Sequence, residues 1–315
     1  MRLYDDEQFQ VRVAWLYHVE GVTQGEIAEK LNVTRLNVNR ALQDALKKGI
    51  VKVNIHSHYS PCFELEKQLK KAFNLQYVSV VPSPLKDENA LKVVGSETGH
   101  YLSSLLARPS IKLFGISWGE TLKFATRAVT PTKRKDLEIV SVMGGLPEGS
   151  DFNIFSVVSQ LAKSFSADRT YLTLPLFSSS AESRNIIFVQ EVFQETFEKI
   201  RKADGIAISA GDMSKRSLLI NYSLPSDVTR KTLIEAGAVG DILGYFLDEN
   251  GKIIDHPIAE RVLGLNPFEF QGKPNLILAA GGKYKQKIIL AALRTGIFDT
   301  LITDQSAAEC VIERS

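Results

Sequence analysis

The sequence predicts an α/β protein in two parts: a short N-terminal region with the spacing of a winged helix-turn-helix, then a larger Rossmann-like domain with a mostly parallel sheet. Signals for three capped helices fall within the first 57 residues. From Tyr77 onward, short apolar segments typical of strands alternate with amphipathic segments typical of helices. Such alternation favours a parallel sheet whose two faces are both covered by helices.

The first two helices are defined by their end signals. An amphipathic helix is expected over about Asp5–Val19, and Gly21 ends it. Thr23 and Glu26 then match a capping box, in which each side chain satisfies a free backbone N–H group of the other. The second helix is therefore expected to begin here and to run to about Leu31.

The third helix and a following strand complete the N-terminal region. Thr34 is placed to cap a helix over Arg35–Lys47, and Gly49 stops it. Residues Ile50–Ile55 alternate like a strand, which is the element that a winged helix-turn-helix adds.

A polar linker, His56–Pro61, separates the two parts, so we expect domains at residues 1–57 and 58–315. An amphipathic helix over Pro61–Phe73 follows and is a candidate subunit interface. A hairpin is expected around Leu243–Ile254, with Asn250-Gly251 as its turn. The expected strands of the large domain are Tyr77–Val81, Ile111–Ile116, Glu138–Met143, Arg169–Thr173, Gly205–Ser209, Asn275–Ala280 and Thr300–Thr303. The expected helices are Asn89–Leu106, Thr121–Arg127, Asn153–Phe165, Val189–Lys202, Asp227–Ala236 and Lys285–Thr295.

The N-terminal spacing suits a DNA reader, because a helix-turn-helix presents its second helix to the major groove. Residues 34–52 contain five basic residues and one acid, a local charge of +4 that can neutralise several phosphates. Arginine and asparagine can also read base edges. A three-helix packing motif with a solvated basic face is the plainer alternative. The candidate DNA contacts are Thr23, Gln24, Thr34, Arg35, Asn37, Asn39 and Arg40.

Three glycine-bearing loops follow predicted strands and should meet at one edge of the sheet, where open parallel sheets bind ligands. They are Gly115–Thr121, Gly144-Gly145 and Gly281–Lys285. Glycines allow a ligand close to the backbone, and helix N-termini supply free N–H groups. Lys283 and Lys285 would add positive charge at this edge. Each loop alone could be a simple turn, and Arg261 could be either an anion clamp or a surface arginine.

Composition excludes several other functions. The net charge is only +2, so nucleic acid must be bound by a local patch. Two cysteines are too few for a disulfide framework, which favours the cytoplasm. We expect no signal peptide, and no membrane contact because no apolar run reaches the roughly 18 residues of a membrane span.

No catalytic set and no cofactor or metal site is expected. Five acids lie near predicted strand ends or turns without a His or Cys at catalytic spacing: Asp204, Asp212, Asp241, Asp248 and Asp304. His56, His58 and Cys62 lack a fourth metal ligand and suit a solvated linker better. Met143, which precedes Gly144, cannot form a Schiff base.

The order of motifs resembles the SorC-type (SorC/DeoR-like) sugar-operon regulators over essentially the whole chain. The matching segments are TQGEIAEKLNVTRLNVNRAL, KKGIVKV, GISWGET, MGGL, YLTLP, AVGDILGYFLDENG, AERVLGL, LAAGGKYK and LITDQSAAE.

The resemblance implies a tetrameric transcription factor controlled by a sugar or phosphosugar effector, with an effector domain related to sugar-phosphate isomerases and deaminases. By position, Ser117, Trp118, Gly119 and Thr121 would cradle a phosphate. The pocket would be completed by Gly144, Gly145, Arg261 and Lys285, to which the third loop adds Gly281, Gly282 and Lys283. Asn37 and Asn39 depart from the family pattern, so the operator sequence cannot be inherited.

We therefore expect a ligand-responsive regulator that binds operator double-stranded DNA. One alternative is a sugar-phosphate isomerase or deaminase with an N-terminal extension, because fold does not determine function. The other is a nucleotide-binding module, against which the absence of a Gly-Lys-Ser/Thr sequence and of GxGxxG both count.

Overall fold

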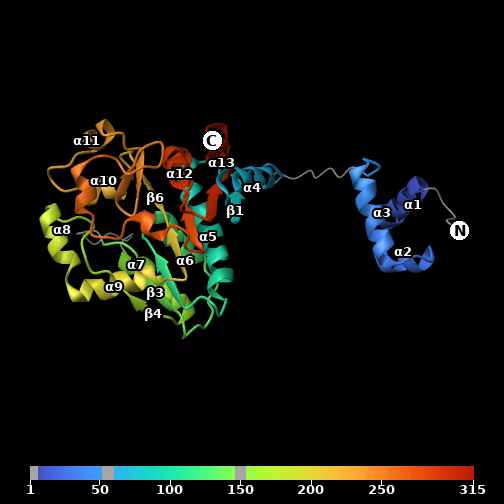
Figure 1. Cartoon of the computed structure of the whole chain (residues 1–315), viewed down its shortest axis with the longest axis horizontal. Coiled ribbons are helices and arrows are strands. Elements are labelled where there is room, and N and C mark those ends of the chain that lie inside the picture. Colours follow the sequence, from blue (N-terminus) through green and yellow to red (C-terminus); the bar gives the residue numbers. More distant parts are fainter. Residues whose placement is uncertain (1–5, 52–59, 146–153) are drawn as a thin grey trace. The chain divides into compact units, whose positions relative to one another are not determined.

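The computed structural model describes residues 6–51, 60–145 and 154–315. The chain divides into two compact units, Met1–Ser57 and His58–Ser315, so the division falls where the sequence places the domain boundary. Figure 1 shows the helices of the first unit in blue and the larger α/β unit in the colours from cyan to red.

The first unit is built from three helices, α1 (Asp6–His18), α2 (Gln24–Lys30) and α3 (Arg35–Lys47). Its core contains Val13, Leu16, Ile27, Val38 and Leu42, all at least nine-tenths buried. The predicted capping box is present, because the backbone N–H of each partner, Thr23 and Glu26, donates to the side chain of the other. Thr34 caps α3 as predicted, its Oγ1 accepting from the Asn37 N–H at 3.2 Å.

The wing strand expected over Ile50–Ile55 falls largely outside the described residues. Ile50 and Val51 belong to no strand, and the Val51 N–H donates to the Ala45 carbonyl at 3.1 Å. His56 and His58 also lie outside the described part of the chain, but Cys62 does not lie in a solvated linker as expected: it is 1% exposed within helix α4 (Ser60–Phe73).

The second unit is organised around a seven-stranded sheet in the order β1-β10-β9-β5-β2-β3-β4, with every neighbouring pair parallel. The strands are β1 (Tyr77–Val81), β2 (Leu113–Ile116), β3 (Glu138–Ser141), β4 (Asp168–Thr170), β5 (Gly205–Ile208), β9 (Leu276–Ala279) and β10 (Thr300–Asp304). These are the seven strands that the sequence predicts, which confirms a mostly parallel α/β fold.

Helices occupy most of the connections between these strands. They are α4 (Ser60–Phe73), α5 (Ala90–Leu106), α6 (Glu120–Ala128), α7 (Ile154–Phe165), α8 (Ala181–Phe188), α9 (Glu191–Arg201), α10 (Leu218–Tyr222), α11 (Arg230–Glu235), α12 (Gln286–Arg294) and α13 (Gln305–Glu313). Short 3-10 turns lie at η1 (Asp87–Asn89), η2 (Pro257–Arg261), η3 (Pro267–Phe270) and η4 (Lys283–Lys285). None of the helices in the described part of the chain has the length and apolarity needed to span a bilayer.

A smaller antiparallel sheet contains β6 (Ala210–Asp212), β7 (Gly240–Ile242) and β8 (Tyr245–Leu247). Its strands β7 and β8 form a hairpin that was not expected, with a turn at Leu243-Gly244, where both residues have positive φ. The predicted hairpin around Asn250-Gly251 is present in a short form: Leu247 and Ile253 form an antiparallel bridge, and the Ile254 N–H donates to the Phe246 carbonyl at 3.0 Å.

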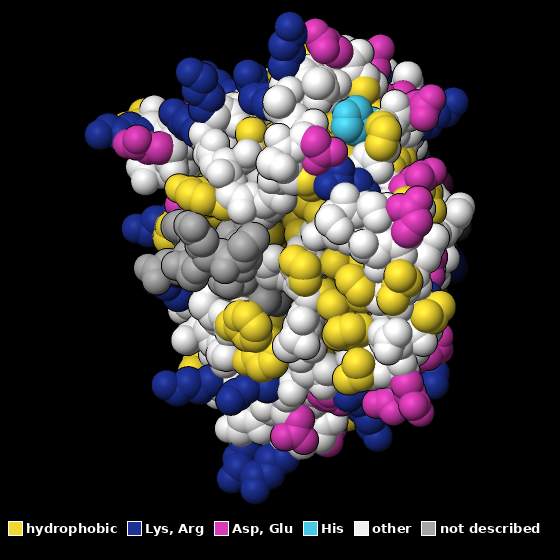
Figure 2. Space-filling view, turned by 90° about the vertical axis from the view of Figure 1, so that its left-hand side faces the viewer, with side chains coloured by type: hydrophobic (Ala, Val, Ile, Leu, Met, Phe, Trp, Pro, Cys, Tyr) yellow, Lys and Arg dark blue, Asp and Glu magenta, His cyan; other side chains and the backbone are white. Residues whose placement is uncertain are grey.

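The amphipathic helix α4 uses part of its apolar surface within its own domain, while Phe63 on the same helix is 62% exposed. Leu65 and Leu69 are buried in the core of their own domain, where α4 packs against β1 and α13. The exposed apolar side chains gather elsewhere, on α8 and α9 and the turn between them: Ile186, Val189 and Val192 are 64%, 74% and 65% exposed. Figure 2 looks onto the side of the molecule where α8 and α9 lie and shows a group of hydrophobic side chains there.

Candidate functional site

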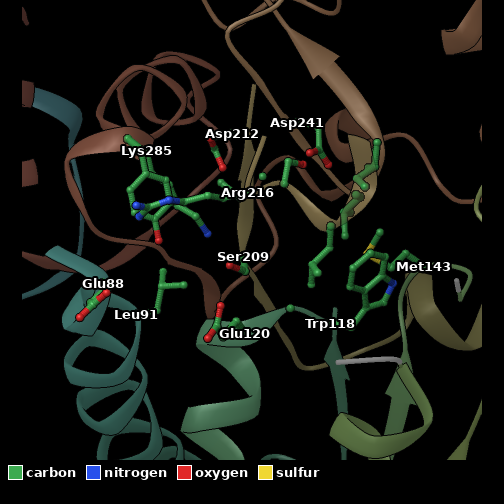
Figure 3. Close-up of a pocket in the computed structure, with 18 residues that line it drawn as sticks. Glu88, Leu91, Trp118, Glu120, Met143, Ser209, Asp212, Arg216, Asp241 and Lys285 are labelled. Carbon is green, nitrogen blue, oxygen red and sulfur yellow. The ribbon is translucent and has the colours of Figure 1, made fainter. Parts of the chain in front are cut away.

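A cavity of about 220 Å³ lies at the carboxyl ends of the central strands β2 and β5. From β2 the chain moves outward through β3 to β4, whereas from β5 it moves the other way through β9 to β10. Ligands of open α/β sheets bind at such a reversal of strand order. The cavity is lined by Glu88, Leu91, Trp118, Gly119, Glu120, Met143, Ser209, Ala210, Gly211, Asp212, Arg216, Ser217, Leu218, Leu219, Asp241, Leu243, Tyr284 and Lys285 (Figure 3).

Hydrogen bonds fix the base of the cavity. The Ser117 N–H donates to the Ala207 carbonyl at 2.9 Å, and the Ser117 Oγ accepts from the Ser209 N–H at 3.2 Å. The Trp118 indole donates to the Gly144 carbonyl at 2.8 Å. Gly144 is needed for this close packing, because a Cβ there would lie 2.6 Å from the Leu174 carbonyl oxygen. Two of the three loops predicted from glycines, Gly115–Thr121 and Gly144-Gly145, are thus held by specific contacts and not only by turn geometry.

Two buried acids and a buried lysine form the polar end of the cavity. Asp212 and Asp241 lie on the neighbouring strands β6 and β7, and Lys285 ends η4. Asp241 accepts from the Gly244 N–H at 3.2 Å, while Asp212 accepts from the Ser214 N–H at 2.7 Å. The ammonium of Lys285 makes no ion pair or hydrogen bond with the described residues, although these acids lie close enough to act on its charge. It is therefore available to a ligand.

Burial shifts the protonation of this group. Loss of solvent raises the pKa of Asp241 to about 6, against smaller opposing effects of the Gly244 N–H and Lys285. The same loss of solvent lowers the pKa of Lys285, and the charges of Asp212, Asp241 and Glu120 oppose that change. The charge of this polar end therefore changes near pH 6, because the Asp241 carboxyl gains or loses its proton there.

Apolar and aromatic side chains line the rest of the cavity. Figure 3 shows Ser209 between Trp118 and Met143 on one side and Lys285 and Arg216 on the other. The Arg216 guanidinium stands over the Tyr284 ring, 5.4 Å from its centroid. Burial, followed by the charge of Asp212, raises the pKa of Tyr284, so its hydroxyl stays protonated and can donate.

The structure separates the predicted effector residues into groups. Trp118, Gly119 and Lys285 line the cavity. Ser117, Gly144 and Gly145 lie beneath it, and Thr121 is fully buried with no hydrogen-bond partner for its hydroxyl among the described residues. The third loop is tied to neighbouring acids: Asp304 accepts from the Gly282 N–H at 2.6 Å, next to Gly281, and Asp87 accepts from the exposed Lys283 N–H at 3.0 Å.

Arg261 is placed differently from the prediction. It does not line the cavity, and its guanidinium donates to both carboxylate oxygens of Asp227, at 2.8 and 3.1 Å, and to the Ser178 carbonyl at 3.1 Å. Its hydrogen bonds lower the pKa of Asp227. The arginine is 8% exposed and joined to these partners, so the structure does not bring it into the cavity, and its predicted contact with an anion stays a prediction.

Sequence reasoning missed several cavity residues, chiefly Ser209, Arg216 and the two acids Asp212 and Asp241. The acids could be noted as lying near strand ends, but the strands β6 and β7 that bring them together are only three residues long. A buried strand of three residues gives too short a pattern to be recognised.

Most of the predicted DNA contacts are exposed on the surface of the first unit. Gln24 is half-buried, and the other six are exposed: Thr23, Thr34, Arg35, Asn37, Asn39 and Arg40. The four α3 residues lie in its first two turns, and the opposite face of α3 buries Val38, Ala41 and Leu42. The polar side chains are therefore free to contact a partner.

Comparisons with known proteins agree with these features. Residues 57–313 match the family Sugar-bind, described as "Putative sugar-binding domain". The chain is 31% identical over 311 residues to the transcriptional regulator LsrR of Escherichia coli O139:H28, covering 98% of this chain and 95% of that protein. It is 25% identical over 307 residues to the erythritol catabolism regulatory protein EryD of Brucella abortus, covering 98% and 97%.

Solved structures agree on the fold. The full-length sorbitol operon regulator SorC of Klebsiella pneumoniae superposes with a TM-score of 0.73 at 23% identity, over 98% of this chain and 100% of that one. A DeoR family transcriptional regulator of Listeria monocytogenes gives 0.71 at 24% identity, over 79% and 99%. The named relatives are transcriptional regulators rather than enzymes, and the chain belongs to their SorC-type family of regulators with a sugar-binding domain.

Proposed function

We propose that this protein regulates a carbohydrate-utilisation operon, binding operator double-stranded DNA through its first unit and a sugar or sugar phosphate in the cavity of its second. The observation that carries the proposal is the polar end of the cavity, where the free ammonium of Lys285 faces two buried carboxylates. Alternating donors and acceptors of this kind suit a ligand rich in hydroxyl groups.

The DNA-binding half of the proposal is supported by the exposed first turns of α3. Arg35 and Arg40 can contact guanine or phosphate, and Asn37 can contact adenine. The capped ends of α2 and α3 hold these side chains in a fixed position on a small, well-packed core.

Control by a sugar requires that the ligand bind one arrangement of the protein better than another. Typical coupling of about 1–3 kcal/mol would change operator affinity about 5–150-fold. Whether the sugar raises or lowers DNA binding depends on which arrangement the cavity prefers when filled.

The experiment uses the full chain and operator DNA selected from genomic fragments. Fluorescence anisotropy would measure DNA affinity with and without a panel of sugars, alditols and their phosphates. We expect Arg40→Ala to weaken DNA binding with the sugar response preserved, and Lys285→Ala to reduce the sugar response with sugar-free DNA binding nearly intact. Normal DNA affinity for Arg35→Ala, Asn37→Ala and Arg40→Ala alike would refute the reader assignment.

We also propose that the protein acts in the cytoplasm as a homo-oligomer, and the family resemblance suggests a tetramer. A single small reader makes limited contact with DNA, and paired half-sites are the usual remedy. The exposed patch of Ile186, Val189 and Val192 is a better candidate interface than α4. A match to the L-sorbose operon regulator itself stays a prediction from motif order.

A further inference from the structure

We propose that the cavity selects an uncharged polyhydroxy ligand, an unphosphorylated sugar or alditol, over its phosphate ester. This rests on the proposed function and narrows the class of its effector. The first reason is charge: the described lining contains four carboxylate side chains, Glu88, Glu120, Asp212 and Asp241, against the two cations Arg216 and Lys285. A phosphate dianion would enter a site that already has an excess of negative charge.

The second reason is hydrogen-bond chemistry at the polar end. A sugar hydroxyl can donate to Asp212 or Asp241 and accept from Lys285 at the same time, whereas a phosphate dianion can only accept. The carboxylates would then be left without donors from the ligand. Asp212 and Asp241 are one position out of register on β6 and β7, since Asp241 pairs with Gly211 and Asp212 with Gly240, but both line the cavity and can meet different hydroxyls of one carbon chain.

The third reason is that the helix N-terminus at the cavity carries its own carboxylate, and the nearby arginines do not enter the centre of the cavity. Helix α6 starts at the cavity with Gly119 as N-cap, and its first residue, Glu120, brings a carboxylate to the positive end of the helix. Arg216 stands over the Tyr284 ring at the exposed rim, and Arg261 is paired with Asp227 away from the cavity. Lys285 is the buried cation of the lining, and the charges of Asp212, Asp241 and Glu120 act on it; the buried Thr121 hydroxyl also has no partner among the described residues.

The remaining wall suits the carbon side of such a ligand. Trp118 and Met143 face the space across Ser209, and Leu218, Leu219 and Leu243 complete the apolar lining (Figure 3). Aromatic and aliphatic side chains pack against the C–H face of a sugar while its hydroxyls reach polar partners. The volume of the cavity, about 220 Å³, is below the roughly 300–1,000 Å³ of sites that bind drug-sized molecules. The cavity therefore suits a small ligand such as a single sugar or alditol.

The test compares matched neutral and phosphorylated probes on the full chain by isothermal titration calorimetry. The probes are erythritol and sorbitol, the monophosphate of each, and inorganic phosphate. We expect at least one neutral alditol to bind about tenfold or more tightly than its monophosphate, and inorganic phosphate not to compete. Raising salt from about 0.05 M to about 0.5 M should strengthen monophosphate binding and leave alditol binding nearly unchanged, because salt screens repulsion.

Two variants and a control separate the causes. Glu120→Gln should strengthen monophosphate binding and so reduce the ratio between the alditol and monophosphate affinities. Asp212→Asn should weaken the binding of the alditol. Glu249→Gln removes an exposed acid at a distant turn and should change neither affinity. Tighter binding of a monophosphate that weakens with salt, or saturable phosphate binding lost in Lys285→Ala, would overturn this inference alone. If no sugar, alditol or phosphate of the wider panel binds, both this inference and the proposed effector site fail.

Discussion

Replacing Asp241 with asparagine should change how the stability of the second unit depends on pH. The carboxyl is buried and its pKa is raised from 3.8 to about 6, so the folded state holds its proton where the unfolded state has lost it. Stability therefore falls as pH rises between about 4 and 6, because the folded state binds more protons there. Asparagine keeps an oxygen that can accept from the Gly244 N–H but cannot ionise.

The magnitude follows from the size of the shift. A difference of about two pKa units corresponds to about 3 kcal/mol at 1.36 kcal/mol per unit. The wild type loses this much of its free energy of unfolding above pH 6, and the variant, which cannot ionise here, does not. We expect Asp241→Asn to match the wild type near pH 4 and to be more stable by up to about 3 kcal/mol at pH 7.5.

Urea unfolding can measure this difference through a single reporter. The chain has two tryptophans, and in a Trp15→Phe background the emission of the buried Trp118 reports on the second unit. Asp255→Asn, at an exposed acid, controls for the loss of a carboxylate and should stay within about 0.5 kcal/mol of the wild type. The free energies of unfolding of the wild type and of Asp241→Asn would then be compared at each pH. If their difference is constant from pH 4 to 7.5, Asp241 does not titrate as a buried acid.

Three further changes test other parts of the structure. Thr23→Ala removes the capping box of α2 and should cost the first unit about 1 kcal/mol in thermal or urea unfolding followed by circular dichroism; no change would mean that the cap is redundant. Gly211→Ala places a Cβ 2.1 Å from an Asp241 oxygen, so ligand binding measured by calorimetry should fall sharply, and normal binding would contradict the placement of this acid. Val189→Asp puts a charge in the α8–α9 patch and should reduce the oligomer seen in analytical ultracentrifugation; an unchanged mass would exclude the patch as an interface.

Most of the seven parallel strands could be predicted because they are short apolar runs between recognisable helices; the polar edge strand β4 (Asp168–Thr170) is the exception. β5 (Gly205–Ile208), β9 (Leu276–Ala279) and β10 (Thr300–Asp304) are buried throughout, and such runs stand out in any hydrophobic pattern. Local end signals also worked, since the capping side chains Thr23 and Thr34 act within three residues.

The elements that were missed lack such local signals. The helix expected over Val189–Lys202 is present as α9, but α8, which only Val189 and Gln190 separate from α9, was not expected. α13 begins directly after β10, with Asp304 as both the last strand residue and the N-cap. The β7–β8 turn puts Leu243 at φ 54°, a conformation that a leucine side chain rarely adopts, so sequence rules place the turn elsewhere.

The candidate site was only partly predictable for a related reason. The glycine loops reveal themselves by composition, and they do mark the correct edge of the sheet. Asp212 and Asp241 are brought there by pairing between segments far apart in the sequence. Arg261 is the opposite case, since a motif position that suggested a ligand contact is joined to Asp227 by the tertiary fold and lies outside the cavity lining.

A single residue, Ser209, joins β5 of the large sheet to β6 of the small one. Successive side chains of extended chain point to opposite faces, so the length of this joint sets which face of β6 meets the cavity. Inserting one residue after Ser209 would turn Asp212 away from Lys285, whereas inserting two would restore its direction but shift it along the strand. The ligand preference of this site can therefore change by substitution of lining residues. Insertions or deletions between β5 and β6 would instead displace Asp212 from the cavity.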